Sequence, residues 1–193
     1  MLKAALALAL APATAMAQTA PPPVATSAAP ATNAEMTAIF DADQADREAG
    51  AKIDWSAVRP RDLARRARTK ALLDAGALQS GDDYYHAAFV FQHGDDANDY
   101  LLAHTLAVVA IARGRQDATW IATATLDRYL QRIGQKQVFG TQYTRLQDQP
   151  WTQEPYDRTL ISDRLRAALG VPDQAAQDRR RQEMDAQYKA AGK

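Results

Sequence analysis

Single glycines end one helix-forming segment after another in the middle of this chain. Gly76, Gly94, Gly114 and Gly134 each follow a segment in which apolar residues recur every three or four positions. Glycine is the residue that most often follows the last turn of a helix, so the pattern predicts helices joined by short turns. Short turns force neighbouring helices to be antiparallel. We therefore expect an all-α domain, with antiparallel helical hairpins arranged in a bundle or a short helix-pair array.

The helices can be placed from these stops and from capping residues at their starts. They are expected at about residues 35–49, 60–75, 84–93, 97–113, 117–133 and 157–169, with a last, polar helix from Pro172. The second should carry Leu63 and Leu72 on its apolar face and basic residues opposite. Between the fifth and sixth, residues 135–155 are rich in Gln and Thr and predict an ordered surface loop. The helix spacing is similar to that of helix-pair repeats, but no residue pattern recurs at a fixed period.

The first residues have the composition of a secretory signal peptide. Lys3 precedes an apolar run, and Ala15-Met16-Ala17 is a small-x-small cleavage pattern, so residues 1–17 should be removed on export. Residues 18–33 are mostly Ala, Pro, Thr and Ser without a charge, which predicts a disordered linker. Residues 34–193 would then form a single helical domain with its core at about 54–170. The expected location is periplasmic or secreted.

Charge and cysteine content exclude several classes of function. The chain has 23 Lys and Arg against 23 Asp and Glu, so neither a nucleic acid nor an anionic membrane is an expected partner. It has no cysteine, hence no disulfide, thiolate metal site or cysteine nucleophile. No segment after the signal peptide is apolar enough to predict a transmembrane helix. Gly-x-Ser-x-Gly and His-Glu-x-x-His motifs are also missing.

The three histidines, His86, His93 and His104, lie close together in the sequence. Counting residues from the turn near Asp95-Asp96 puts His86 and His104 at nearly the same level of a helical hairpin. The same count from the next turn, near Arg115, places His104 opposite Leu126, Asp127 and Arg128 of the fifth expected helix. A layer of His86, His104 and Asp127 or Arg128 could serve acid–base chemistry or, through the imidazoles and Asp127, hold a divalent metal.

A structural role explains the same residues. A buried histidine hydrogen-bonded to an aspartate, with Arg128 paired to Asp127 or Asp83, would hold the helices in register. His93 precedes a glycine stop, where the helix dipole favours it. A metal site that uses both His86 and His93 is not expected, since seven helical residues separate them by about 10 Å.

Three motifs give a resemblance to a known family. They are Gln92-His93, Asp127-Arg128 and the loop from Gly134 to Gln142. Together they resemble an uncharacterised bacterial domain family of unknown function, which has a Gly-x-x-Gln-x-Tyr-Gly-Thr-Gln loop; Phe139 replaces its usual Tyr. The resemblance covers roughly residues 54–145, about half the chain, and brings no known activity. It implies a single polar cluster, formed by His93, Asp127, Arg128, Gln137, Thr141 and Gln142.

Three functions fit these observations. A periplasmic binding or interaction module would hold a small molecule or a protein partner, with Gln92, Gln137, Thr141 and Gln142 as ligand-binding residues. A small hydrolase or transferase would use a histidine as base, with Asp127 orienting it and Arg128 holding an anion. A tethered structural component of the cell envelope is the third. The enzyme hypothesis predicts that His93, Asp127 and Gln142 converge in a solvent-reached pocket. Neither cofactor nor oligomeric state follows from the sequence.

Overall fold

A computed structural model describes residues 30–146 and 149–190. The predicted signal peptide and residues 18–29 of the predicted linker lie outside the described residues. The helices are α1 (Ala34–Ala45), α2 (Trp55–Asp74), α3 (Gly81–Phe91), α4 (Ala97–Ala112), α5 (Ala118–Arg132), α6 (Asp163–Ala168) and α7 (Gln174–Ala190), with a short 3-10 turn at Gly50–Lys52. The described residues contain no strand, only two isolated β-bridges. The predicted all-α class is confirmed.

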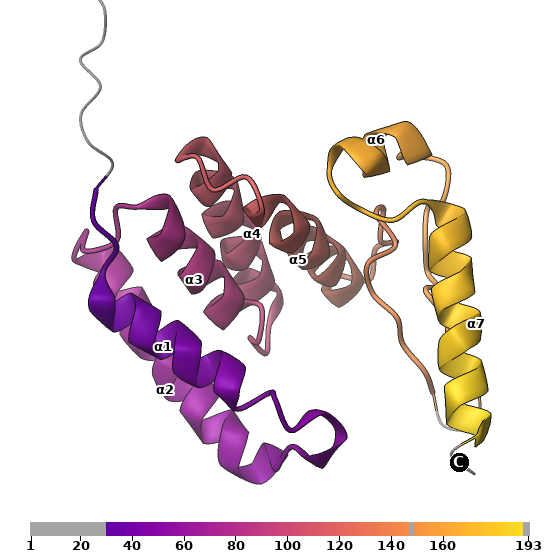
Figure 1. Ribbon diagram of the computed structural model, residues 1–193, viewed down its shortest axis with the longest axis horizontal. Helices are drawn as coiled ribbons and strands as arrows, with labels where there is room; N and C mark the ends of the chain where they lie inside the picture. The colour runs from indigo at the N-terminus through magenta and orange to yellow at the C-terminus, as the bar shows by residue number, and fades with distance from the viewer. Residues whose placement is uncertain (1–29, 147–148, 191–193) are drawn as a thin grey trace, which may run out of the picture.

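Helices α3, α4 and α5 form the centre of the molecule as successive antiparallel neighbours (Figure 1). Helices α1 and α2 form a second pair, and both contact α3. The core between α3, α4 and α5 is rich in alanine, including Ala87, Ala88, Ala103, Ala107 and Ala110, all of which are fully buried. Small side chains let helix axes approach closely, and this explains how a domain with few large apolar residues buries its helices.

Helices α2 to α5 end at the predicted glycine stops. Gly76, Gly114 and Gly134 adopt positive φ angles of 65°, 93° and 74°, which side chains rarely tolerate. Gly94 is needed for a different reason, since a Cβ on it would lie 2.1 Å from the Cβ of Asp99. The turn between α3 and α4 is therefore closed against the first turn of α4.

The second helix differs from its prediction at its start and on its buried face. It begins at Trp55, before Pro60, because the Asp54 side chain caps it by accepting the Ser56 N–H. Leu63, predicted to face the core, is 63% exposed. The buried face instead carries Val58, Asp62, Arg66, Thr69 and Leu72. This helix thus turns two charged side chains, those of Asp62 and Arg66, toward the interior.

Three other boundaries were predicted too generously. Helix α1 ends at Ala45, α6 extends only over Asp163–Ala168, and α7 begins at Gln174. The residues before α6 form a turn because the Asp157 carboxylate accepts the N–H groups of Thr159 and Leu160. Ser162 then caps α6.

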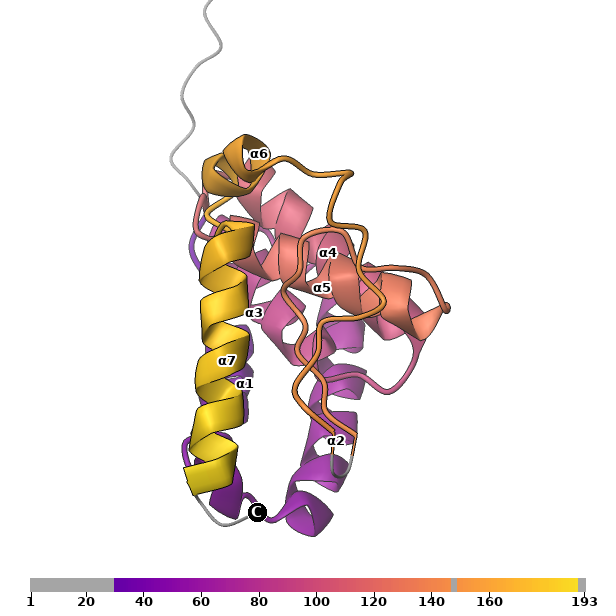
Figure 2. The same ribbon diagram turned by 90° about the vertical axis from the view of Figure 1, so that its right-hand side faces the viewer.

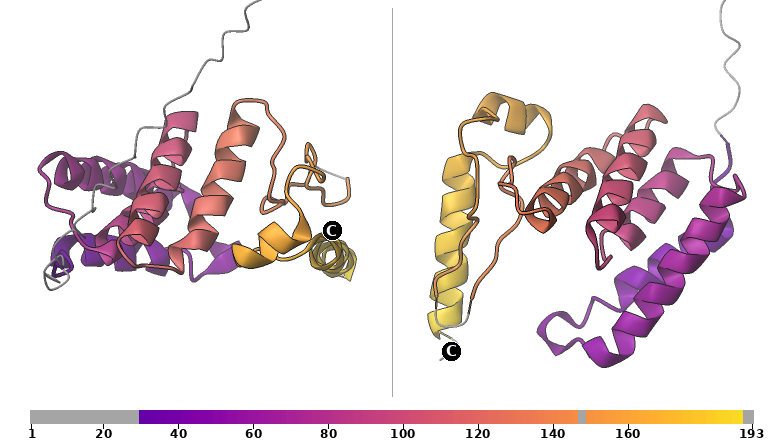
Figure 3. Two further views of the ribbon diagram at one scale, coloured as in Figure 1. Left: turned by 90° about the horizontal axis from the view of Figure 1, so that it is seen from above. Right: turned by 180° about the vertical axis from the view of Figure 1, so that it is seen from behind.

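The C-terminal part of the chain is a polar assembly beside α5. Residues 135–146 and 149–162 run as an irregular loop between α5 and α7 (Figure 2), and α7 stands at the end of the molecule opposite α1 and α2 (Figure 3). Gln137, Gln153, Arg166 and Gln177 are almost completely buried there. Their hydrogen bonds to one another and to loop carbonyls hold this part together beside the few apolar side chains buried there, Phe139, Tyr156 and Val171. Residues 135–146 and 149–155 of the predicted loop are held by these bonds, and residues 147–148 of it lie outside the described residues.

No helix of the described ranges combines the length and the apolar character that a bilayer span requires.

Candidate functional site

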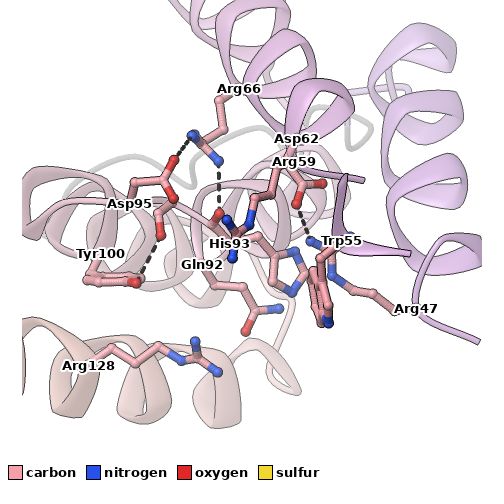
Figure 4. Close-up of a pocket in the computed structure, with 11 residues that line it drawn as sticks. Arg47, Trp55, Arg59, Asp62, Arg66, Gln92, His93, Asp95, Tyr100 and Arg128 are labelled. Carbon is pink, nitrogen blue, oxygen red and sulfur yellow. Dashed lines mark hydrogen bonds and ion pairs between the residues drawn. The ribbon is translucent and has the colours of Figure 1, made fainter. Parts of the chain in front are cut away.

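A cavity of about 350 Å³ lies where α2, the end of α3 and the sides of α4 and α5 meet (Figure 4). Four arginines from three elements line it: Arg47 follows α1, Arg59 and Arg66 come from α2, and Arg128 comes from α5. We call this cavity the arginine pocket. Figure 4 shows Arg128 extending from one side toward Gln92, with His93 and Trp55 on the other.

His93 and Asp43 form a hydrogen-bonded pair at the pocket. The His93 Nδ1 lies 3.1 and 3.2 Å from the two carboxylate oxygens of Asp43. Asp43 is fully buried, and it also accepts hydrogen bonds from Arg47 and Gln44. A carboxylate on Nδ1 fixes the ring and leaves Nε2 as the free nitrogen. The hydrogen bonds found among the described residues include none to that Nε2.

The turn that carries His93 is held by groups that also line the pocket. Arg66 donates to the His93 carbonyl (2.8 Å) and to the Asp95 carboxylate (2.6 Å). The Tyr100 hydroxyl donates to the Gly94 carbonyl (2.9 Å), and the Asp95 N–H donates to Asp99 (3.0 Å). These bonds position the imidazole while leaving the cavity beside it open.

The pocket carries more positive than negative charge. Arg47 pairs with Asp43 and Asp62, and Arg66 pairs with Asp95. Asp62 in turn is shared between Arg47 and Arg65. Within the part of the chain that the structure describes, Arg59 and Arg128 belong to no ion pair. Two guanidinium groups therefore remain uncompensated.

Arg128 is the more buried of these two cations. Its Nε is buried and has no hydrogen-bond partner in the described structure. Burial lowers the pKa of Arg128, because removing the guanidinium from water disfavours its charged form, and the neighbouring Tyr100 hydroxyl offsets part of this. An arginine nonetheless keeps its charge in proteins. The group is thus a partly desolvated cation at the wall of a cavity.

Asp127, predicted to join Arg128 and a histidine, faces the C-terminal loop instead. One oxygen accepts the N–H groups of Val138 (2.8 Å) and Phe139 (3.0 Å). The other accepts the N–H and hydroxyl of Thr141 at 2.9 and 2.7 Å. With four bonds and no exposed surface, the carboxylate has no free oxygen for a histidine or a substrate. It is a loop anchor.

Gln137, Thr141 and Gln142 belong to the same anchor and not to the arginine pocket. Gln137 exchanges hydrogen bonds with the backbone of Gln142, both at 3.0 Å. Gln142 also donates to the Ala124 carbonyl on α5 (3.2 Å). The predicted convergence of His93, Asp127 and Gln142 is therefore not observed. Of the predicted site residues, Gln92, His93 and Arg128 come together in the pocket.

His86 and His104 are separated by their partners. His86 stacks on Phe40 of α1, with ring centroids 4.3 Å apart, and burial lowers its pKa. The His104 Nδ1 lies 2.8 Å from the Ala122 carbonyl on α5. One histidine thus faces α1 and the other α5, and Asp127 contacts neither, so the predicted layer does not form. Residues 30–146 and 149–190 contain no group of three His, Asp or Glu residues arranged to hold a metal ion.

Several residues at the pocket were not singled out in the sequence, among them Asp43, Trp55, Arg59, Asp62, Arg66 and Tyr100. Arg66 belongs to a basic run that is typical of a solvated face, yet it is 7% exposed. The sequence does indicate that Arg66 is buried, because it belongs to a set of residues at helical spacing: Val58, Asp62, Arg66, Thr69 and Leu72. That stripe places Asp62 and Arg66 on the buried face.

Comparisons of this chain with known proteins gave no match. No protein-family model matches the chain, and neither the curated proteins nor the solved structures contain a match. The resemblance seen in the Gln-His, Asp-Arg and Gly-Thr-Gln motifs gains no support from them.

Proposed function

We propose that this protein binds a small anionic molecule in the arginine pocket. One observation carries the proposal: the Arg128 guanidinium is partly buried, faces the cavity, and has neither an ion-pair partner nor a bond to its buried Nε in the described structure. An uncompensated cation away from water is costly unless something pairs with it. A bound anion would supply that partner.

The surrounding charges support an anion of low charge. The acidic groups at the pocket are already engaged, Asp43 and Asp62 by arginines and Asp95 by Arg66. Arg59 and Arg128 are left to attract a ligand. A guanidinium presents paired N–H donors that match the oxygens of a carboxylate or a phosphate. The ligand class is therefore a carboxylate or a phosphate ester that fits the cavity.

Calorimetric titration of the full protein with inorganic phosphate and with acetate tests this proposal. Arg128→Gln should weaken binding at least about tenfold, since hydrogen bonds to charged groups contribute about 1.5–3 kcal/mol. Arg179→Gln is the matched control, because Arg179 is exposed on α7. Equal losses in the two variants, or no binding by the wild type, would remove the proposal.

Hydrolysis of the bound anion is a second candidate function, favoured by the His93–Asp43 pair. With Nδ1 bonded to Asp43, the His93 Nε2 is placed to take a proton from water. That water would attack the phosphorus of a phosphate ester, the ester P–O bond would break, and the proton would pass to the leaving alcohol. In this candidate Asp43, and not Asp127, is the group that orients the histidine.

Release of 4-nitrophenol from 4-nitrophenyl phosphate measures this candidate. His93→Gln should abolish the release, and Asp43→Asn should lower kcat by about 10²-fold or more, in keeping with the usual contribution of acid–base groups. His104→Gln is the control substitution, because the His104 ring bonds to the Ala122 carbonyl and does not line the pocket. Unchanged binding without any turnover would leave the binding proposal and exclude hydrolysis.

We further propose that the protein acts outside the cytoplasm, in the periplasm or as a secreted protein. The support is the signal-like composition of residues 1–17 and the uncharged linker that follows them. Fractionation of cells that express the full chain tests this location.

A further inference from the structure

We propose that the ligand of the arginine pocket carries a planar aromatic ring attached to its phosphate or carboxylate group. This inference rests on the proposed binding function and specifies its ligand. The observation behind it is the indole of Trp55, which lines the same cavity as the uncompensated arginines and is 50% exposed.

Trp55 is placed at the pocket by the start of α2. Asp54 caps this helix, so Trp55 is its first residue and Arg59 follows one turn later on the same face. Among the described residues, Trp55 takes part in no aromatic pair, in no arginine–ring contact and in no part of the apolar core. An indole left half exposed beside a cavity is the kind of surface that binds a flat apolar group.

Several acceptor groups at the pocket are already hydrogen-bonded within the protein and are less available to a hydroxyl group of a ligand. The carbonyls of His93 and Gly94 already accept hydrogen bonds from Arg66 and Tyr100. Both oxygens of Asp62 are occupied by Arg47 and Arg65. A hydroxyl-rich ligand such as a sugar phosphate would thus depend on the acceptors that remain, which include the Gln92 amide oxygen, the second Asp95 oxygen and the His93 Nε2. A ring needs none.

The size of the cavity sets the scale of the ligand. A volume of about 350 Å³ is at the lower end of the range seen for small-molecule pockets. One ring with one anionic group fits that range. The pocket would then hold the ring against Trp55 and the anion against Arg128 or Arg59.

Titrations with matched anions test the inference. Phenyl phosphate, methyl phosphate and inorganic phosphate share a head group, and benzoate and acetate form the carboxylate pair. Stacking of a ring on an aromatic side chain should make phenyl phosphate bind at least about fivefold more tightly than methyl phosphate. The corresponding ratio of benzoate to acetate shows whether the carboxylate is accepted as well as the phosphate.

Variants assign the preference to Trp55. Trp55→Ala should reduce the phenyl-to-methyl ratio to about one, and Trp55→Phe should retain most of it. Trp120→Ala is the matched control, because Trp120 is 44% exposed but lines a different hollow near α7. Circular dichroism of each variant establishes that it is folded.

The outcomes separate the two proposals. If none of the anions binds, the binding function fails. If phosphate binds in an Arg128-dependent way but phenyl and methyl phosphate bind equally, only the present inference is overturned. Retention of the full ratio in Trp55→Ala overturns it as well.

Discussion

Asp127 and Arg128 are neighbours in the sequence, but their side chains serve different sides of α5. Asp127 accepts four hydrogen bonds from the C-terminal loop, while Arg128 reaches the arginine pocket without a carboxylate partner in the described structure. Successive residues of a helix differ by about 100° in direction, so this division follows from the helix itself. These two consecutive residues of α5 thereby connect the C-terminal loop to the arginine pocket.

Replacement of Asp127 should test the loop anchor. In Asp127→Asn, the side chain loses its charge and presents an N–H group where it must accept hydrogen bonds. We expect the free energy of unfolding to fall by about 2–4 kcal/mol, the range for unpaired buried polar groups and lost charge-assisted bonds. Urea unfolding followed by circular dichroism measures this change. Phosphate affinity of the folded variant should be unchanged, whereas a selective loss of affinity would assign Asp127 to the ligand site.

The sequence could predict the helices of the centre because their ends are determined locally. Gly76, Gly114 and Gly134 adopt the positive φ angles that a glycine stop requires. The start of α2 differs from the prediction because Pro60 favours a start at about residue 60, whereas Asp54 is the capping residue. Cap and proline both fit the general rules, and only packing decides between them.

The candidate site was predicted in part. Gln92, His93 and Arg128 were identified and do meet in one pocket. Asp43 could not be found, since it is 50 positions from His93 and nothing in its neighbourhood marks it as fully buried. Asp43 meets His93 only because α1 packs on α3, and this packing cannot be read from the local sequence. The same applies to Trp55, whose position at the cavity depends on the angle between α2 and α3.

His86 should make the stability of the fold depend on pH. Burial lowers its pKa below the value of 6.5 that it has when unfolded. The unfolded state then binds the proton more readily, so stability is full above about pH 6.5 and decreases as the pH falls toward the folded pKa. Thermal unfolding at pH 7.5 and 5.5 should show a smaller drop in Tm for His86→Phe than for the wild type. An identical drop in both proteins would mean that other groups cause it.

Gly94 should be intolerant of a side chain because of space. In Gly94→Ala the new Cβ would lie 2.1 Å from the Asp99 Cβ, so the turn between α3 and α4 must move. We expect a loss of about 1–3 kcal/mol in the free energy of unfolding, the usual cost of overpacking. Gly114→Ala is the comparison, since its φ is positive but nothing lies within 4 Å of its Cβ. Because the same turn carries His93, anion affinity should fall in Gly94→Ala and stay unchanged in Gly114→Ala.

Removal of the predicted signal peptide can be measured directly. Mass spectrometry of protein recovered from outside the cytoplasm should give Gln18 as the first residue, since cleavage is expected after Ala17. Ala15→Arg places a large charged residue at a position that requires a small one. This variant should accumulate as the uncut chain, and normal processing of it would contradict the assigned cleavage site.

Arg128 should lower the stability of the ligand-free protein and should contribute to anion binding. Arg128→Met removes a desolvated cation and keeps an unbranched side chain of similar length, so in anion-free buffer the variant should be as stable as the wild type or more stable by about 1 kcal/mol. Adding a ligand that binds only the folded state raises stability by RT ln(1 + [L]/Kd). Phosphate should therefore raise the Tm of the wild type by a few degrees and leave that of Arg128→Met nearly unchanged. Since excluded-salt effects of phosphate act on both proteins alike, the difference between the two Tm shifts isolates the pocket. Equal shifts would show that Arg128 does not bind the anion and that its burial serves the packing of α5 alone.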